Sequence, residues 1–487
     1  MNTIKSIKNI SLSVILFFIM SCKKEQLDLY PKTSLTEGNS YTTETQLTQA
    51  VNDVYRQMRV IYNAQGIADL FGELRSDNTY IKIAAGGGTN AIDISNFIIR
   101  TDNPLIATAW ANCYNAIFIC NNAVEHLEKT AVVFQQPDVK ERLKAEAIFV
   151  RSLIYFDMVR AWGDVPLVLK VITPEQSYDY LRERKDLVYK QIIADLNYCK
   201  NTLPDKYTGS NVGRITKGGA TGVLAKIYLT LGDKDKAEKE LREIVASGIY
   251  SLDANGNGIV NSEDYLFNFQ AATKNSKESV LEVQYLAGVN ASNSNHQEYY
   301  APWHFAFHLP GSTENLLGQG FNTPTDDIFN EFEANDPRKA ASVNPGFINL
   351  STNQFVDYPW TPKFNDPNWR NPGQNFEIIR YADVLLMLSE VTGDPSMLNL
   401  VRARVGLPGF GQTGFPSQYN TLTKAIEHER RVELCFEFHR FFDLVRTGRA
   451  IEVMQAKGYK INQNNILFPV PLNTIDVNPK ITQNPGY

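Results

Sequence analysis

Apolar residues recur at intervals of three and four along most of the first half of the chain, the spacing that places them on one face of an α-helix. Residues at the segment ends agree with this interpretation: Pro137 stands where one such segment begins, and Gly163 stands where it ends. The spacing predicts an all-α fold with helices over residues 45–62, 106–127, 139–162, 186–203, 216–231, 234–247, 376–391 and 423–444.

Two of these segments, 216–231 and 234–247, are joined only by Gly232-Asp233 and carry small residues where two helices would have to approach closely. This combination is typical of a tetratricopeptide-like hairpin. A single hairpin of this kind cannot bury its apolar face alone, so it predicts neighbouring helical hairpins stacked against it. Residues 145–162 resemble part of a second hairpin.

Residues 271–375 lack this periodicity and are rich in Asn, Pro, Gly and aromatic residues. A stretch of about a hundred irregular residues is too long for a simple connection and is typical of a functional surface. The predicted architecture is therefore a frame of tetratricopeptide-like helical hairpins with a large, loop-rich part that binds the ligand. Near the end of the chain, residues 466–472 are predicted to be extended and packed on the body of the protein.

Composition narrows the class of protein. Of the 487 residues, 43% are hydrophobic and 21% are charged, which fits a globular protein and excludes wholesale disorder and a polytopic membrane protein. The net charge of -5 argues against nucleic-acid binding, which needs a basic surface. No GxSxG, HExxH or Walker A motif is present. Four scattered cysteines are predicted to be free thiols in the core: Cys113, Cys120, Cys199 and Cys435.

The first 21 residues have the features of an export signal. Two lysines precede an apolar run over residues 10–20, which is too short to span a membrane comfortably. The run ends in Ile-Met-Ser-Cys, which resembles a bacterial lipobox, so we expect a signal peptide over residues 1–21, lipid on Cys22 and a tether over residues 22–43. An ordinary signal peptide followed by a chance cysteine is the alternative. Removal of the signal leaves a charge of 46 − 53 = −7, so attachment would depend on the acyl chains rather than on anionic lipid.

A twelve-residue loop from Asp253 to Asp264 has the spacing of a calcium-binding loop, with oxygen-bearing side chains at positions 1, 3, 5, 9 and 12 and glycine at position 6. The predicted calcium ligands are Asp253, Asn255, Asn257, the Ile259 carbonyl, Asn261 and Asp264. The last position departs from the glutamate of EF-hands and resembles the calcium loops of dockerins. The alternative is an Asn/Gly/Asp turn that holds no ion. A second pair of possible metal ligands, His304 and His308, has no obvious third ligand.

Several segments, taken together, resemble the SusD/RagB family of outer-membrane nutrient-binding lipoproteins. The resemblance is carried by the expected lipobox and by segments at 73–78, 145–167, 376–390, 426–446, 468–471 and 484–487. It implies an all-α frame, a ligand surface built on the C-terminal half, and no catalysis. It divides the chain into a SusD-like helical region over 44–270 and a loop-rich region over 271–487. The motif Glu429-Arg430-Arg431 is interpreted as part of a buried ion-pair network rather than as a binding site.

The resemblance also implies an oligosaccharide ligand and a SusC-like TonB-dependent transporter partner, with the protein held on the outer membrane by its lipid. Flat aromatic side chains and hydrogen-bonding groups match the faces and rims of sugars. The expected ligand contacts are Tyr299, Tyr300, Trp303, His304, Trp360 and Trp369, with Arg75, Asp77 and Asn78 as hydrogen-bonding candidates. A peptide-binding member of the family, an all-α glycoside hydrolase and a tetratricopeptide adaptor remain alternatives.

Overall fold

The computed structural model describes residues 41–82, 88–289, 291–312 and 314–487. The expected signal peptide, Cys22 and nearly all of the expected tether lie outside these ranges. Within them, no helix is both long enough and apolar enough to cross a bilayer.

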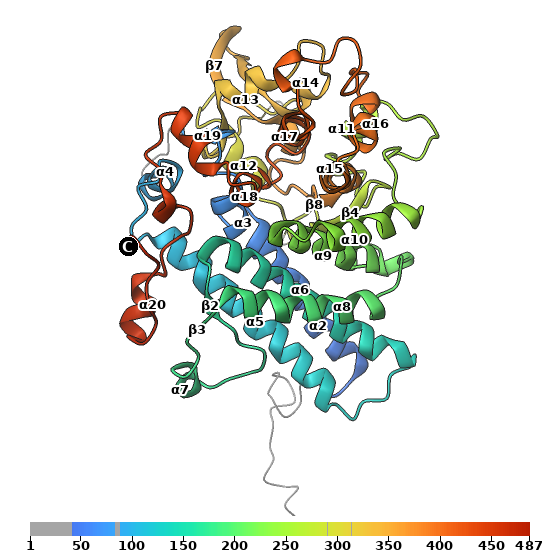
Figure 1. Ribbon diagram of the computed structural model, residues 1–487, viewed down its shortest axis with the longest axis vertical. Coiled ribbons are helices and arrows are strands. Elements are labelled where there is room, and N and C mark those ends of the chain that lie inside the picture. The colour runs from blue at the N-terminus through green and yellow to red at the C-terminus, as the bar shows by residue number, and fades with distance from the viewer. Residues whose placement is uncertain (1–40, 83–87, 290, 313) are drawn as a thin grey trace, which may run out of the picture.

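Long antiparallel helices form the N-terminal part of the molecule (Figure 1). Each of them packs on the next one in the stack, in the order α2 (Glu44–Tyr62), α5 (Pro104–Lys129), α6 (Pro137–Trp162), α8 (Lys185–Thr202), α9 (Lys217–Leu231) and α10 (Lys234–Ala246). Two short helices, α3 (Ile67–Gly72) and α4 (Thr89–Ser95), lie beside them. The all-α prediction is confirmed, and every long N-terminal helix lies within two residues of its predicted ends.

The helices α9 and α10 form the predicted hairpin. Thr216 caps the start of α9, where its side chain accepts a hydrogen bond from the Gly219 amide. Gly232 ends that helix in the left-handed conformation, with φ +76°, which glycine adopts at no steric cost. Gly222 lies against Ile379, and a Cβ there would stand 3.0 Å from the Ile379 Cδ1 atom. The missing side chain therefore lets α9 approach the C-terminal half closely.

The C-terminal half consists of short elements. They are α11 (Ser262–Phe267), β4 (Ser279–Val283), α12 (His296–Tyr300), β5 (Thr323–Pro324), α13 (Asp326–Glu331), α14 (Arg338–Ser342), β6 (Asn344–Asn349), β7 (Gln354–Trp360), β8 (Phe376–Arg380), α15 (Tyr381–Thr392), α16 (Ser396–Arg404), α17 (Leu422–Glu433), α18 (Arg440–Arg446), α19 (Ala450–Ala456) and α20 (Leu472–Val477). β4 pairs with β8 and β6 with β7, both antiparallel. Two-residue strands make up the remaining pairs: β1 (Thr79–Tyr80) with β5, and β2 (Val165–Pro166) with β3 (Arg182–Glu183).

Two of the predicted helices are interrupted. The segment 376–391 begins as the strand β8 and becomes helical only at Tyr381, because its first five residues are buried in pairing with β4. The segment 423–444 breaks between α17 and α18, where Phe436 and Phe438 both have φ 64°. Lys363 donates a hydrogen bond to the Cys435 carbonyl in this break. Contacts with distant residues therefore override the helical pattern at both places.

The extended C-terminal tail closes the core, as predicted. Trp162 donates a hydrogen bond from Nε1 to the Pro469 carbonyl at 3.0 Å. Arg75 was expected to contact ligand, but it lies fully buried beneath the tail and donates to the Ile466 carbonyl. Its guanidinium lies 4.6 to 4.9 Å from the ring centres of four phenylalanines: Phe71, Phe97, Phe441 and Phe468. Arg75 thus fastens the tail to the helices.

Candidate functional site

The loop after α12 folds onto the β6–β7 hairpin and forms a small aromatic core. Phe307 and Trp360 lie edge to face in this core, with ring centres 5.0 Å apart. Trp303 and Trp369 pack against it from outside and remain half-buried, while Phe305 is 75% exposed. The region 271–375 thereby presents aromatic side chains at the surface.

Trp369 lies beside two exposed charged side chains, Glu314 and Arg370. Its Nε1 atom donates to the Glu314 carboxylate at 3.2 Å, and the neighbouring Arg370 donates to the same carboxylate from Nε at 3.0 Å. The Arg370 guanidinium also lies 4.6 Å from the centre of the Trp369 ring. The side chains of Arg370 and Glu314 are 66% and 55% exposed, so both can still bond to a ligand. A flat ring beside exposed donors and acceptors has the chemistry needed to bind a sugar.

We define the aromatic surface as Trp303, His304, Phe305, Glu314, Trp369 and Arg370. Of the predicted ligand contacts, it contains Trp303, His304 and Trp369. Sequence reasoning missed Phe305, Arg370 and Glu314; Arg370 adjoins a predicted tryptophan, but no pattern connects Glu314 with position 369.

The other predicted aromatic contacts lie deeper. Tyr300 and Trp360 are only 2% and 3% exposed, and the Trp360 Nε1 atom donates to the Gly346 carbonyl. Tyr299 is half-buried and packs against Phe321. Residues 301–309 form turns, so His304 and His308 do not share a helix face, and His304 accepts a hydrogen bond from the Ala306 amide. Burial removes Tyr300 and Trp360 from any surface contact with a ligand.

Asp77 and Asn78, predicted to bind ligand, instead position arginines. Asp77 pairs with Arg440 through two hydrogen bonds of 2.7 and 2.9 Å, and Asn78 accepts a hydrogen bond from Arg431 at 2.9 Å. Burial alone would raise the pKa of the Asp77 carboxyl, but Arg440 and Arg431 hold that pKa well below its usual value. Asp77 therefore stays charged in the folded protein.

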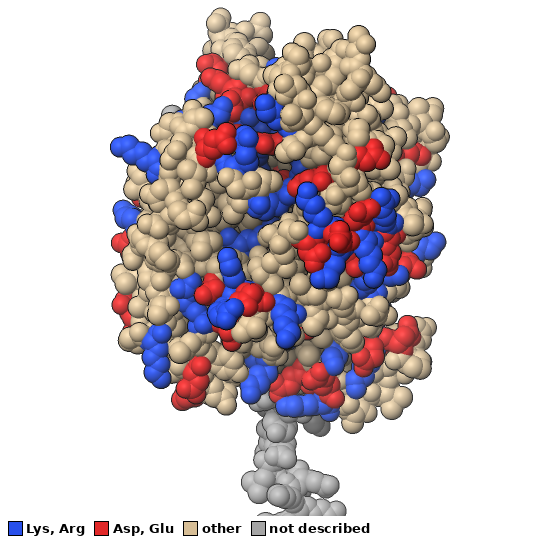
Figure 2. All heavy atoms as spheres, viewed as in Figure 1, with Lys and Arg blue, Asp and Glu red and all other residues tan. Residues whose placement is uncertain are grey.

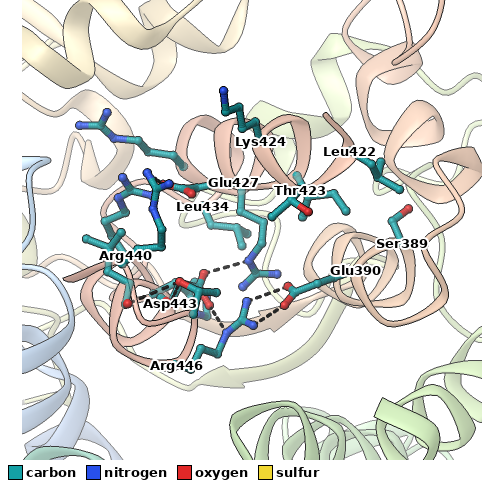
Figure 3. A pocket seen from close by; sticks show the side chains of 18 of the residues that line it. Ser389, Glu390, Leu422, Thr423, Lys424, Glu427, Leu434, Arg440, Asp443 and Arg446 are labelled. Atoms are coloured by element: carbon teal, nitrogen blue, oxygen red, sulfur yellow. Dashed lines mark hydrogen bonds and ion pairs between the residues drawn. The ribbon is translucent and has the colours of Figure 1, made fainter. Parts of the chain in front are cut away.

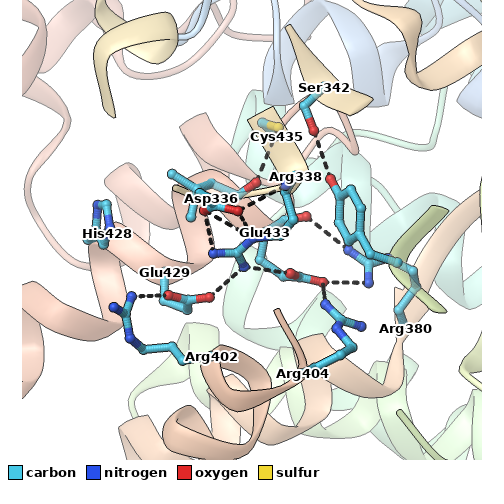
Figure 4. Close-up of polar contacts among 12 residues, drawn as sticks. Asp336, Arg338, Ser342, Arg380, Arg402, Arg404, His428, Glu429, Glu433 and Cys435 are labelled. Carbon is cyan, nitrogen blue, oxygen red and sulfur yellow. Dashed lines mark hydrogen bonds and ion pairs between the residues drawn. The ribbon is translucent and has the colours of Figure 1, made fainter. Parts of the chain in front are cut away.

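A buried network of ion pairs links α17 to its neighbours (Figure 4). Arg338 bonds to both Glu429 and Glu433, and Arg402 bonds to Glu429 at 2.8 Å. Arg404 joins Glu433 at 2.6 Å, and all of these side chains are fully buried. Glu429 thus belongs to the buried network that the sequence predicted. Arg430 and Arg431 are also buried and ion-paired, Arg430 with Asp383 and Arg431 with Asp77, and both line a hollow beside α17.

This hollow, of about 450 Å³, lies between α15, α17 and α18 (Figure 3). We call it the arginine hollow. Asp443 receives hydrogen bonds from Arg430 at 2.8 Å and Arg446 at 2.7 Å, and Arg446 also bonds to Glu390. Figure 2 shows Lys and Arg side chains gathered in the middle of the face where these helices lie. Sequence reasoning treated this motif as scaffold and did not find the hollow, because its walls come from separate segments.

The loop from Asp253 to Asp264 adopts a series of tight turns. The Asp253 carboxylate accepts hydrogen bonds from the amides of Asn257 at 3.1 Å and Gly258 at 3.0 Å. The Asp264 carboxylate accepts from the Asn255 and Asn261 amides, so both acids turn toward the loop backbone. Gly258 has φ +86°, the conformation expected at the sixth position. Both carboxylates therefore bond to the backbone of their own loop, and the described residues contain no cluster of three or more His, Cys, Asp or Glu that could hold a metal ion.

Comparisons with known proteins cover nearly the whole chain. A family model described as SusD family matches residues 344–487, and one described as "Starch-binding associating with outer membrane" matches residues 25–229. SusD-like protein P25 of Formosa agariphila is 24% identical over 99% of both chains. SusD-like protein P2 of the same organism is 25% identical over 98% of this chain and 99% of its own.

Solved structures agree with these matches. A laminarin binding SusD-like protein is 27% identical, with a TM-score of 0.77 over 92% of this chain and 100% of its own. Surface glycan-binding protein A from Bacteroides thetaiotaomicron, in complex with laminarihexaose, is 20% identical, with a TM-score of 0.76 over 91% of this chain and 100% of its own. The second likeness concerns the fold alone.

Proposed function

Because the chain belongs to the SusD/RagB family, we propose that it binds an extracellular oligosaccharide on the aromatic surface and delivers it to a SusC-like TonB-dependent transporter. Members of this family bind carbohydrate and are not enzymes, which confirms the expectation that the chain has no catalytic role. The description of the matching N-terminal family model supports an association with the outer membrane.

The group formed by Trp369, Arg370 and Glu314 is the observation that carries this proposal. A pyranose ring presents an apolar CH face that can stack on the tryptophan and hydroxyl groups that can bond to the exposed guanidinium and carboxylate. The ion pair with Arg370 holds Glu314 in place before ligand arrives, at 2.9 Å. Such preorganisation lowers the entropy that binding would otherwise lose.

The choice of a glycan over a peptide is supported by the laminarin binding of the 27% identical structure. The remaining parts of the proposal are the lipid anchor at Cys22, the position facing the cell exterior and the transporter partner. An acyl anchor would hold the protein at the membrane without a spanning helix, while the aromatic surface would remain free for ligand.

Calorimetry tests the proposal on a soluble form that begins after Cys22, with a panel of oligosaccharides that includes laminarin fragments. We expect at least one glycan to bind, and Trp369→Ala to weaken that binding about fivefold, since the lost stacking is worth roughly 1 kcal/mol. Phe118→Ala is the matched control, because Phe118 is an exposed aromatic residue on α5, outside the aromatic surface. Peptide binding with no response to any glycan would favour the peptide-binding alternative. An unchanged affinity in Trp369→Ala would exclude the aromatic surface.

A further inference from the structure

The arginine hollow differs in charge from the rest of the protein. The chain carries a net charge of -5, whereas the side chains that line the hollow include seven Lys and Arg against three Asp and Glu. Ion pairs to Asp77, Asp327 and Asp383, which are not among these lining side chains, offset part of the positive charge, so the hollow attracts anions only where its donors remain unpaired.

The arginines at the base of the hollow are held from one side and retain free donors. Arg430 donates from Nε to Asp443 at 2.8 Å and from Nη1 to Asp383 at 2.7 Å, and its Nη2 atom has no hydrogen-bond partner among the described residues. Arg440 uses two of its nitrogens on Asp77, and its third lies 3.5 Å from Glu427. The acids therefore fix each guanidinium plane without using all of its N–H groups.

Two cations at the rim are freer still. The Lys424 side chain is exposed and has no ion pair or hydrogen bond within the part of the chain that the structure describes; Figure 3 shows it extending away from the ion pairs below. Arg449 lies 3.6 Å from Glu427 and 3.8 Å from Glu452, longer than hydrogen bonds, and its Nε atom has no partner. Both side chains can bind an anion without breaking a strong ion pair.

The rest of the lining suits an organic ligand rather than a bare ion. Leu422, Ile426 and Leu434 provide apolar wall beside the charges. Burial and the neighbouring Lys226 lower the pKa of His439 to about 3, so its imidazole is neutral. The Lys226 ammonium donates a hydrogen bond to the Nδ1 atom of this imidazole, and the imidazole proton is therefore on Nε2. A volume of about 450 Å³ falls within the range of small-molecule pockets.

A second hollow of about 320 Å³ continues from the first. The two share Lys424, Glu427, Arg431, Arg440 and Arg449, so they form one groove across α17, α18 and α19. A ligand longer than one unit can therefore extend along the groove beyond the hollow.

We propose that the arginine hollow binds a sugar unit that carries a carboxylate or a sulfate group. The guanidinium and ammonium groups would bond to the anion, and the apolar wall would pack against the ring. The inference rests on the proposed function only for the ligand being a sugar, and it narrows that ligand to acidic oligosaccharides. The hollow is separate in composition from the aromatic surface, since the two share no residue.

Calorimetry tests this with three probes: an oligosaccharide of glucuronic acid units, a neutral glucose oligosaccharide of equal length, and sodium sulfate. We expect the acidic oligosaccharide to bind more tightly than the neutral one, and its affinity to fall as NaCl is raised because salt screens the charges. The double variant Lys424→Ala/Arg449→Ala should lose at least tenfold in affinity for it. Lys190→Ala/Lys480→Ala removes the same charge from exposed lysines outside both hollows and should have no effect.

Equal affinities of the wild-type protein and the Lys424→Ala/Arg449→Ala variant for the acidic oligosaccharide would overturn the inference. Binding of sulfate alone, or of an oligoglutamate peptide but no acidic sugar, would also overturn it. Trp369→Ala separates the two proposals. If acidic sugar binds through Lys424 and Arg449 but no glycan depends on Trp369, the aromatic surface fails and the hollow stands. If a glycan depends on Trp369 but no acidic sugar depends on Lys424 and Arg449, the arginine hollow fails and the aromatic surface stands.

Discussion

Two tryptophans nine residues apart have different roles because their environments differ. Trp360 is 3% exposed in the aromatic core, whereas Trp369 lies half-buried beside exposed charged groups. We expect Trp360→Ala to lower the free energy of unfolding by about 3 kcal/mol or more, since it leaves a large cavity. Trp369→Ala should lower it far less while weakening glycan binding. Chemical denaturation beside calorimetry separates the two effects, and equal destabilisation by both would contradict this division.

Glu377 and Glu282 are paired cross-strand residues of β8 and β4, and both side chains are buried. Burial, together with the neighbouring Glu282 carboxyl, raises the pKa of Glu377 well above its usual value. The folded state therefore holds a proton that the unfolded state releases near pH 4.5. The stability that this bound proton contributes is fully present below pH 4.5 and is lost as the pH rises toward the folded-state pKa of Glu377.

In Glu377→Gln, the side-chain amide can donate a hydrogen bond to the Glu282 carboxylate without taking up a proton. We expect this substitution to raise the free energy of unfolding at pH 8 by about 1 kcal/mol or more, with a smaller change at pH 5. Glu429→Gln should lower the free energy of unfolding at pH 8. Burial would raise the pKa of Glu429, but Arg338 and Arg402 hold it below its usual value, so the charged carboxylate stabilises the fold. Denaturant titrations at both pH values measure this, and a destabilised Glu377→Gln at pH 8 would refute it.

At the scale of elements, the sequence predicted the long helices well because apolar residues recur along each of them at intervals of three and four residues. It did not predict the strand β8, where Ile379 fits a helical pattern but pairs with Leu281 of β4. It also missed the break before α18, where Phe436 and Phe438 take positive φ. In both places, partners far along the chain decide the backbone, and a periodicity of neighbouring residues carries no information about them.

The loop from Asp253 to Asp264 is the element for which we expect a metal ion. Calcium should raise the melting temperature relative to EDTA, because an ion that binds only the folded loop stabilises the folded state. Asp253→Ala should abolish that increase, whereas Glu263→Gln, which removes a charge at a position not predicted to bind the ion, should retain it. Thermal unfolding with and without calcium measures the difference. An unchanged melting temperature in the wild-type protein would leave the loop as an ion-free turn.

At the scale of the whole molecule, sequence patterns located the aromatic surface in part and the arginine hollow not at all. Trp303 and Trp369 stand in a segment that is conspicuous for its aromatic residues. Lys424 lies in α17 and Arg449 immediately before α19, and only the fold brings them to one rim. Asp77 lies in a turn far away in the sequence and forms an ion pair with Arg440. A site assembled from residues this far apart has no local signature, so only the three-dimensional structure reveals it.

Attachment to the membrane depends on the charge of the whole molecule and on its lipid. The chain from Cys22 onward carries a charge of 46 − 53 = −7, so an anionic lipid surface would repel it. The proposed anchor is the lipid on Cys22, whose acyl chains would insert into the bilayer whatever the charge of the protein. Cys22→Ser should therefore move the protein from the membrane fraction to the soluble fraction, while 1 M NaCl should not release the wild-type protein. Fractionation followed by immunoblotting measures both. Retention of Cys22→Ser in membranes would show that another contact, such as the transporter, is sufficient to hold the protein there.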